Sequence, residues 1–348
     1  MKYAKRIAIA FVACLITLAC VELVYSEMHL NVYRGGGTSE GPVWSWIIYD
    51  PLMGWMNKPR YIKPNQFRID KNGFRIIESS SSPDKNKRLI VCMGDSGTFG
   101  IWAAREDSKF GGLEFDSFPF YLQGILFGRN DKIINAGTIG YSSAHLLRQY
   151  VVSIRKLKPQ IIVIRIGHND HMPSWDKRLD MQQPKNAALR YLYRNYPSTL
   201  TAQTIAYYSY VFSLRSMDAP WSTLDQYESN LRTLIHIANS DGVRVLLVDY
   251  PLRSPVIPPT SKEGLMKQLS AMKMVSYEAY LAAHEKFMQR MEAVAQSTGA
   301  QVIRTRSRLE DPKEAAFSRF DVVHPNKHGM QIIAEEIAKV LLKDTGNQ

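Results

Sequence analysis

From residue 88 onward, short apolar runs alternate with longer segments in which apolar residues recur at helical spacing. The apolar runs are nearly continuous, which is typical of strands in a parallel sheet covered on both faces. The helical segments between them are long enough to cross back over such a sheet. The pattern predicts strands at 88–93, 131–135, 160–166, 243–249 and 300–305, and helices at 143–157, 222–240, 262–298 and 326–343.

This alternation predicts a three-layer αβα domain, a parallel sheet between two layers of helices joined by right-handed crossovers. Two segments interrupt it. Residues 171–221 mix tyrosines with lysines and arginines, and residues 250–261 are rich in proline. Both follow a predicted strand, so we expect both at the carboxyl edge of the sheet, where ligands bind in such folds. They would either shape a substrate cleft or cap the sheet.

The first part of the chain has a different pattern. A basic tail, residues 1–6, precedes an apolar run, residues 7–25, whose single charge is Glu22 near its far end. The run is long enough to span a bilayer, and basic residues before a span keep that end in the cytoplasm. We therefore expect a transmembrane signal anchor. A cleaved signal peptide ending near Ser26 and a lipoprotein processed at Cys20 remain alternatives.

Between this segment and the main domain, the sequence predicts two further regions. Residues 26–45 include a glycine-rich polar stretch and are expected to form a flexible tether. Residues 46–87 contain short apolar pieces broken by turn residues, which predicts a small β extension with a turn at 71–73. The main domain then covers residues 88–345, with 171–221 as an insertion.

Composition and charge narrow the classes of partner. With 45% hydrophobic and 22% charged residues, the chain is that of a globular protein. Its net charge of +12 favours anionic surroundings such as membrane phosphates or acidic glycans, although a solvated basic surface explains it equally well. No zinc knuckle or aromatic–basic motif of a nucleic-acid reader is present, so we expect no nucleic-acid partner. Only Cys92 lies beyond the apolar run, so we expect no internal disulfide.

Polar or glycine-rich turns follow four of the predicted strands. Ser96 follows the first strand in GDSGTFG, Gly140 follows the second in NAGTIGYSS, and Asn169 follows the third in GHND. Asp321 and His324 follow the fifth strand, in DVVHPNKHG. Because the carboxyl ends of parallel strands share one edge of a sheet, we expect all four turns to lie close together there.

These residue types suit a nucleophilic ester chemistry. A serine hydroxyl needs an adjacent base, and His324 is the candidate that would take the proton from Ser96. Asp321 lies three residues earlier, a spacing that lets a turn place its carboxylate beside the imidazole. Backbone N–H groups of Ser96 and Gly140 and the Asn169 amide would stabilise an oxyanion. Taken singly, each of these residues also fits a turn or a helix cap.

Other polar residues near these turns are not expected to take part. Asp95 is interpreted as structural, accepting hydrogen bonds from turn amides. His168 and His171 are expected at the edge of the cleft or on the surface, and His328 in the last helix. Their spacing shows no ligand geometry for a metal, so the sequence predicts neither a metal nor a cofactor.

Together these blocks resemble the SGNH/GDSL hydrolase family, whose members are serine esterases and acyl-transfer enzymes with a flavodoxin-like α/β fold. The resemblance spans about residues 88–345 and includes each of the turns that name the family. It implies the catalytic set Ser96, Asp321 and His324, with Ser96, Gly140 and Asn169 forming the oxyanion hole. Gly97 stands where the family name has leucine.

The resulting hypothesis is a serine ester hydrolase in the inner membrane, anchored by its N-terminal helix and facing the periplasm. It would remove O-acyl groups from a cell-envelope glycan through a Ser96 acyl-enzyme. The first alternative is an O-acyltransferase to a glycan that uses the same residues. A lysophospholipase acting on a lipid ester and a non-catalytic glycan-binding scaffold are further alternatives. The oligomeric state is left open.

Overall fold

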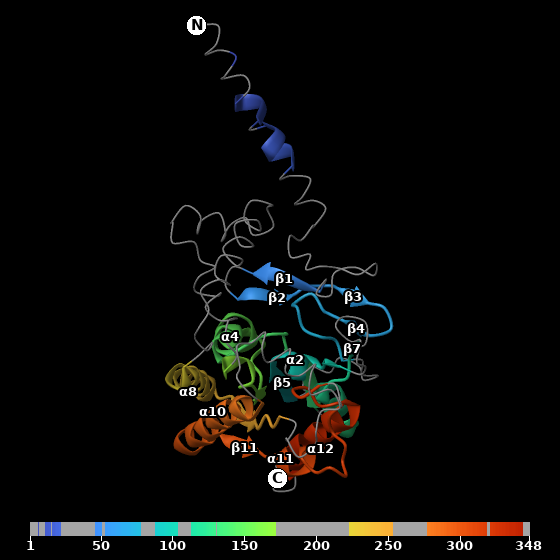
Figure 1. Cartoon of the computed structure of the whole chain (residues 1–348), viewed down its shortest axis with the longest axis vertical. Coiled ribbons are helices and arrows are strands. Elements are labelled where there is room, and N and C mark those ends of the chain that lie inside the picture. Colours follow the sequence, from blue (N-terminus) through green and yellow to red (C-terminus); the bar gives the residue numbers. More distant parts are fainter. Residues whose placement is uncertain are drawn as a thin grey trace. The chain divides into compact units, whose positions relative to one another are not determined.

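The computed structural model describes residues 6, 11–14, 16–21, 46–50, 53–77, 88–103, 113–129, 131–171, 223–252, 277–318 and 321–343. The chain divides into two compact units, residues 1–56 with 177–217, and residues 57–176 with 218–348. Most of the predicted insertions at 171–221 and 250–261 lies outside the described residues. The second unit contains the sheet and the candidate site (Figure 1).

The first unit is described over short stretches only. It contains helical residues within 6–21, and the strand β1 (Ile47–Asp50), which pairs with β2 (Gly54–Asn57). In the described part of the chain, no helix has both the length and the apolar character that crossing a membrane requires. The anchor at 7–25 and the domain boundaries stay predictions.

The second unit is built on five parallel strands. Their order across the sheet is β11-β10-β9-β5-β8, which is the flavodoxin-like order and confirms the predicted fold class. All five strands were predicted from the apolar runs, within two residues at each end. They are β5 (Arg88–Gly94), β8 (Asp131–Asn135), β9 (Ile161–Arg165), β10 (Arg244–Val248) and β11 (Gln301–Ile303).

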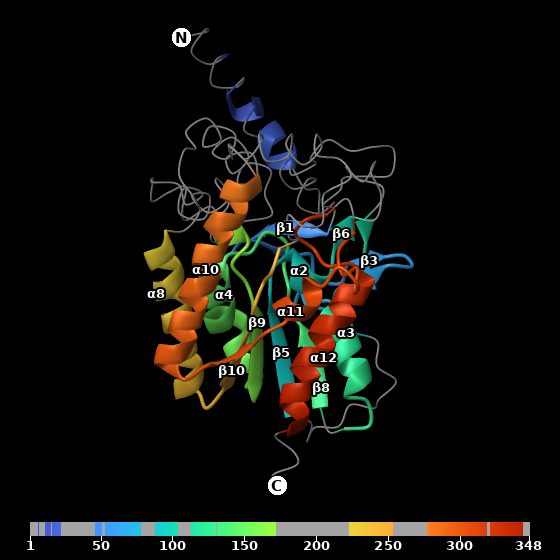
Figure 2. The ribbon, with the colours of Figure 1, turned by 60° about the horizontal axis from the view of Figure 1, so that its bottom comes forward.

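Helices cover both faces of this sheet, as Figure 2 shows. On one face, α3 (Phe118–Ile125) packs against α12 (Lys327–Lys343), and their apolar residues form one buried cluster with alternate residues of the strands. The other face carries the neighbouring helices α4 (Ser143–Gln149), α8 (Leu224–Ser240) and α10 (Tyr277–Thr298). Because both faces are covered, the inner strands β5, β9 and β10 are buried over most of their length, which explains their nearly continuous apolar sequences.

The helices match the prediction less closely than the strands. Helix α3 was not predicted, because its eight residues include Pro119 and Gly124, which weaken a helical pattern. The segment 143–157 was predicted as one helix, but after α4 it continues as a π-helix, Tyr150–Ile154, and a 3-10 turn, Arg155–Leu157. Helix α10 begins at Tyr277; the earlier part of the predicted helix lies outside the described residues.

Two short antiparallel pairs of strands accompany the sheet, one before β5 in the chain and one after it. Strands β3 (Ile62–Lys63) and β4 (Phe67–Arg68) are antiparallel, and the Asp70 carboxylate accepts the N–H groups of Asn72 and Phe74 at 2.8 and 2.9 Å. The predicted turn at 71–73 is therefore confirmed. A second small pair consists of β6 (Trp102–Ala103) and β7 (Leu113–Glu114).

A buried arginine connects this region to the sheet edge. The backbone N–H of Arg75 donates to the carbonyl of Asn135 at 3.0 Å. Its guanidinium donates to the carbonyl oxygens of Phe99, of Gly100 at 3.2 Å and of Phe115 at 2.7 Å. Arg75 thereby satisfies carbonyl groups at the end of the short helix that follows β5, which fixes that helix on the carboxyl edge of the sheet.

Candidate active site

Ser96 is presented by a tight strand-to-helix turn. Strand β5 ends at Gly94, Asp95 has extended backbone angles, and helix α2 (Ser96–Phe99) begins immediately. The Asp95 carboxylate caps this helix by accepting the N–H of Gly97 at 2.9 Å. Gly94 has to be glycine, because a side chain there would overlap the carbonyl oxygen of Arg165 on the neighbouring strand β9. The turn therefore fixes Ser96 at the carboxyl edge of the sheet.

Ser96, His324 and Asp321 form one chain of hydrogen bonds. The Ser96 hydroxyl lies 2.7 Å from Nε2 of His324, and Nδ1 of His324 lies 2.9 Å from Oδ2 of Asp321. The carboxylate accepts from Nδ1–H, so this arrangement fixes the tautomer that leaves Nε2 free to accept the serine proton. The other oxygen of Asp321 accepts the N–H groups of Val323 and His324, both at 2.9 Å, which holds the loop before α12 in shape.

The electrostatics of this chain suit a base that works near neutral pH. Burial disfavours a charged His324, but the Asp321 carboxylate outweighs burial and raises the pKa of His324 above its usual value. Burial likewise disfavours a charged Asp321, but its contacts with His324 hold the pKa of Asp321 below its usual value. Asp321 is therefore the ionised partner, and His324 binds a proton more readily than an isolated histidine.

The predicted oxyanion donors lie on the turns that follow β5, β8 and β9. In the described part of the chain, neither the N–H of Ser96 nor that of Gly140 donates to an acceptor. Gly140 has a φ of 78°, a conformation that favours glycine. The Asn169 amide donates to the carbonyl of Tyr141 at 2.9 Å and to Oδ2 of Asp95 at 3.2 Å. Asn169 thus links the turn after β8 with the turn that carries Ser96.

Two polar residues at this edge were missed by the sequence analysis. Arg165, the last residue of β9, is fully buried, and its guanidinium carbon lies 3.5 Å from the ring centroid of Tyr250. The Tyr250 hydroxyl donates to Oδ1 of Asp95 at 3.2 Å. The sequence signal for Arg165 was its place at the end of the otherwise apolar run IIVIR. A charged residue in a buried strand has to be compensated by neighbouring groups inside the fold.

His168 and His171 were expected at the edge of the cleft or on the surface, and the surface position was wrong. Both are buried, with 6% and 3% of their surface exposed, because the turn that carries them packs against α10. Nδ1 of His168 lies 3.0 Å from the Tyr280 hydroxyl, and Nε2 of the neighbouring His284 lies 2.5 Å from the Tyr250 carbonyl oxygen. Burial lowers the pKa of all three histidines, to about 4 for His171. Across the described residues, no cluster of histidine, cysteine or carboxylate side chains could hold a metal.

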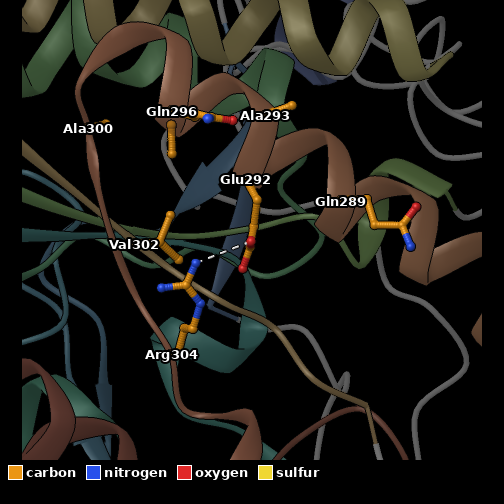
Figure 3. Close-up of a pocket in the computed structure, with 8 residues that line it drawn as sticks. Gln289, Glu292, Ala293, Gln296, Ala300, Val302 and Arg304 are labelled. Atoms are coloured by element: carbon orange, nitrogen blue, oxygen red, sulfur yellow. Dashed lines mark hydrogen bonds and ion pairs between the residues drawn. The ribbon is translucent and has the colours of Figure 1, made fainter.

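A pocket of about 530 Å³ lies between α10 and β11 (Figure 3). Figure 3 shows Arg304 and Glu292 facing each other there, and their side chains form an ion pair at 3.2 Å. None of the predicted site residues lines this pocket. Its other lining residues include Gln289, Gln296 and Val302, which carry no nucleophile or base.

Comparison with known proteins identifies the family. Residues 92–332 match the model of the GDSL-like lipase/acylhydrolase family. No curated protein sequence matches the chain.

Similar solved structures share little sequence with the chain. A catalytic mutant of an acetylxylan esterase from Geobacillus stearothermophilus is 17% identical, with 72% of this chain and 93% of that chain covered and a TM-score of 0.42. A GDSL-like lipase from Bacteroides thetaiotaomicron is 15% identical, with 76% and 92% covered and a TM-score of 0.44. An α/β hydrolase from the metagenome of Lake Arreo, Spain, is 17% identical, with 72% and 94% covered and a TM-score of 0.44.

Proposed function

The chain belongs to the GDSL-like lipase/acylhydrolase family and is a serine carboxylic ester hydrolase, and from this premise we propose that it acts through a Ser96 acyl-enzyme and removes O-acyl groups from a cell-envelope glycan. One observation carries the assignment of the nucleophile. It is the continuous hydrogen-bond chain from the Ser96 hydroxyl through His324 to Asp321, with distances of 2.7 and 2.9 Å.

The reaction follows from this chain of contacts. The Ser96 oxygen attacks the ester carbonyl carbon while Nε2 of His324 takes the hydroxyl proton, and Asp321 stabilises the resulting imidazolium. The tetrahedral intermediate collapses when the C–O bond to the alcohol breaks and the alcohol oxygen receives the proton from His324. Water then attacks the acyl-enzyme by the same route, which releases the carboxylic acid and restores Ser96.

The negative oxygen of the tetrahedral intermediate would lie among three donors. The N–H groups of Ser96 and Gly140 have no acceptor within the described residues, so each can donate a hydrogen bond to the oxyanion without losing one to those residues. The Asn169 amide donates its two hydrogens to Tyr141 and Asp95, so it would donate to the oxyanion by giving up or sharing one of these two hydrogen bonds. Preorganised donors of this kind typically contribute about 3–4 kcal/mol each to lowering the barrier.

The glycan substrate is supported by the sequence. The net charge of +12 favours an anionic environment, and the apolar segment 7–25 with its basic tail favours an enzyme held at the membrane with its main domain exported. Tyrosines in residues 171–221 are of a type that can stack on sugar rings. An O-acylated envelope polysaccharide satisfies all three features.

The nucleophile is tested with the purified full chain and p-nitrophenyl acetate. We expect Ser96→Ala to lower kcat by about a millionfold while the unfolding temperature stays close to that of the parent, because Ser96 contributes one hydroxyl and little packing. Mass spectrometry of the quenched parent enzyme is expected to show an acyl group on the peptide that contains Ser96. Equal rates for parent and variant would contradict the proposal.

The substrate class is tested by comparing release of acid from acetylated polysaccharide and from lysophospholipid. Faster release from the polysaccharide, lost in Ser96→Ala, supports a glycan substrate. Faster release from the lipid identifies a lipid esterase instead. Transfer of the acyl group to an added glycan, with little free acid, identifies an acyltransferase, in which the cleft excludes water from the acyl-enzyme.

A further inference from the structure

A buried arginine lies directly beside the nucleophile turn. Arg165 pairs in register with Gly94, the residue before Asp95, and none of its surface is exposed. In the described part of the chain, none of its three side-chain nitrogens donates to an acceptor. A buried cation is costly unless other groups compensate its charge, so its retention there calls for a physical explanation.

Two groups compensate the charge of Arg165. Its guanidinium carbon lies 3.5 Å from the ring centroid of Tyr250, which is a close cation–π contact. The carboxylate of the fully buried Asp95 attracts it electrostatically. Arg165 thus contributes a fixed positive charge next to the residue that precedes Ser96.

Asp95 in turn holds three different parts of the site. Its Oδ1 accepts the N–H of Gly97 at 2.9 Å and the Tyr250 hydroxyl at 3.2 Å. Its Oδ2 accepts the Asn169 amide at 3.2 Å. An ionised carboxylate accepts all three hydrogen bonds, whereas a protonated carboxyl has one oxygen occupied by its own proton. The ionisation of Asp95 therefore affects both the turn of Ser96 and the orientation of Asn169.

Gly97 provides the space for this arrangement. A Cβ atom at Gly97 would overlap Nη1 of Arg165 and would lie 2.8 Å from the Tyr250 hydroxyl oxygen and 3.3 Å from Oδ1 of Asp95. Gly97 stands where the family name has leucine. The space that a leucine side chain would need is occupied here by the guanidinium of Arg165 and the phenol of Tyr250. The glycine and the buried arginine depend on each other sterically.

We propose that Arg165 is a positioning residue for the ester hydrolysis, whose charge keeps Asp95 ionised so that Asp95 holds Asn169 and the Ser96 turn in place. The proposal rests on the proposed function, because it concerns the same site. Burial holds the pKa of Asp95 above its usual value, and the charges of Arg165 and His324 offset part of that rise. The titratable or charged groups that face Asp95 or Arg165 are Tyr250, His168, His284 and His324.

The test is the pH profile of kcat for Arg165→Met in the full chain, with p-nitrophenyl acetate as substrate. His324 sets the acid limb in the parent, and the Arg165 charge also lowers the pKa of His324. Without the cation, Asp95 remains protonated to a higher pH as well, so the acid limb is expected to move up by about 1–3 pH units and to become steeper, because two groups rather than one then have to lose a proton, with KM nearly unchanged. Arg165→Lys keeps the charge and is expected to restore the parent profile. An unchanged profile, or a loss that is equal at every pH, would overturn the proposal.

Arg88→Met is the matched control. Arg88 is the first residue of β5, at the opposite end of the strand from Ser96, and it forms an ion pair with Asp131 at 2.7 Å. Arg88→Met makes the same substitution in the same sheet, but far from the site. It is expected to leave the pH profile of kcat unchanged. A shift of the acid limb in this control as large as that in Arg165→Met would count against a specific role for Arg165.

Gly97→Ala tests the same idea if Arg165→Met does not fold. The added methyl group displaces the guanidinium from its place beside Asp95, so the acid limb is expected to move in the same upward direction. A uniform loss at every pH would instead indicate a steric effect alone and would contradict the proposal.

Parent and Ser96→Ala are assayed in parallel, so that a failure of the proposed function can be distinguished from a failure of the role of Arg165. Equal rates for those two enzymes would refute the proposed function, whereas a normal profile for Gly97→Ala in an active background would refute only the role of Arg165.

Discussion

The hydroxyl oxygen of Ser96 lies 2.7 Å from Nε2 of His324, although 228 positions separate the two residues in the chain. Ser96 is fixed by the turn after β5, and His324 by the loop before α12, whose shape depends on Asp321. The two halves of the site therefore come from segments near the beginning and the end of the domain's sequence. Each half can be tested separately.

Asp321→Asn is expected to lower kcat by about ten thousandfold, because an amide no longer stabilises the imidazolium of His324 and favours the wrong tautomer. The Asp321 carboxylate is also what raises the pKa of His324. Activity requires a neutral His324, so in the parent the acid limb of kcat/KM should lie above the usual histidine pKa, and in the variant it should move to lower pH. Steady-state rates measured across the pH range check both effects. Full activity in Asp321→Asn would show that His324 works without its carboxylate.

Asn169→Ala is expected to lower kcat by about a hundredfold to a thousandfold with little change in KM, because the lost amide would act on the oxyanion rather than on the ground-state ester. The measurement is a full kinetic analysis with p-nitrophenyl acetate. Asn230→Ala is a suitable control. Asn230 lies on helix α8, and its amide donates a hydrogen bond of 3.0 Å to the Ser143 hydroxyl. A loss in Asn169→Ala that appears mainly in KM would argue for substrate binding instead.

Acid is expected to destabilise the fold through the buried histidines. Burial lowers the pKa of His171 to about 4, so the unfolded chain binds a proton below about pH 6.5 that the folded chain does not bind. Stability contributed by a neutral His171 is therefore present at pH 7 and lost as the pH falls, by about 2 kcal/mol at pH 5. Urea unfolding at both pH values measures this loss.

A matched pair of variants isolates the histidine contribution. His171→Gln is expected to flatten the dependence of the free energy of unfolding on pH, because the titrating group is gone. His236→Gln, at an exposed position on α8, is expected to leave the slope as it is in the parent. Equal slopes for all three proteins would show that the buried state of His171 does not contribute to acid stability.

Gly94→Ala is expected to destabilise the protein by about 3 kcal/mol, because the new methyl group would overlap the Arg165 carbonyl oxygen and force β5 and β9 apart. Gly124→Ala provides the opposite case. Apart from its chain neighbours and the backbone of its own helix, no atom of the described residues lies within 4 Å of the position that a Cβ would take at Gly124. Helix α3 also gains propensity from alanine, so a stabilisation of up to about 1 kcal/mol is expected. Thermal unfolding of both variants distinguishes a steric requirement from a general cost of replacing glycine.

Local patterns determined the strands and most of the site residues in advance. A strand buried on both faces is mostly apolar, so β5, β9 and β10 could be recognised from short stretches of sequence. The turns with Ser96, Gly140 and Asn169 follow strands directly, and parallel strands place such turns on one edge. Helix α3 escaped prediction because Pro119 and Gly124 interrupt its local signal.

The rest depended on contacts between distant segments. The order of the strands, the 2.7 Å approach of Ser96 to His324 and the burial of His168 under α10 arise from packing that no local window contains. Arg165 is the clearest case, since its sequence context shows only a charge at the end of an apolar strand. Only the fold places that charge beside Tyr250 and Asp95, because the side chains that end or follow β5, β9 and β10 are buried there together. Sequence by itself determined which residues stand at the sheet edge, and tertiary structure decided which of them interact.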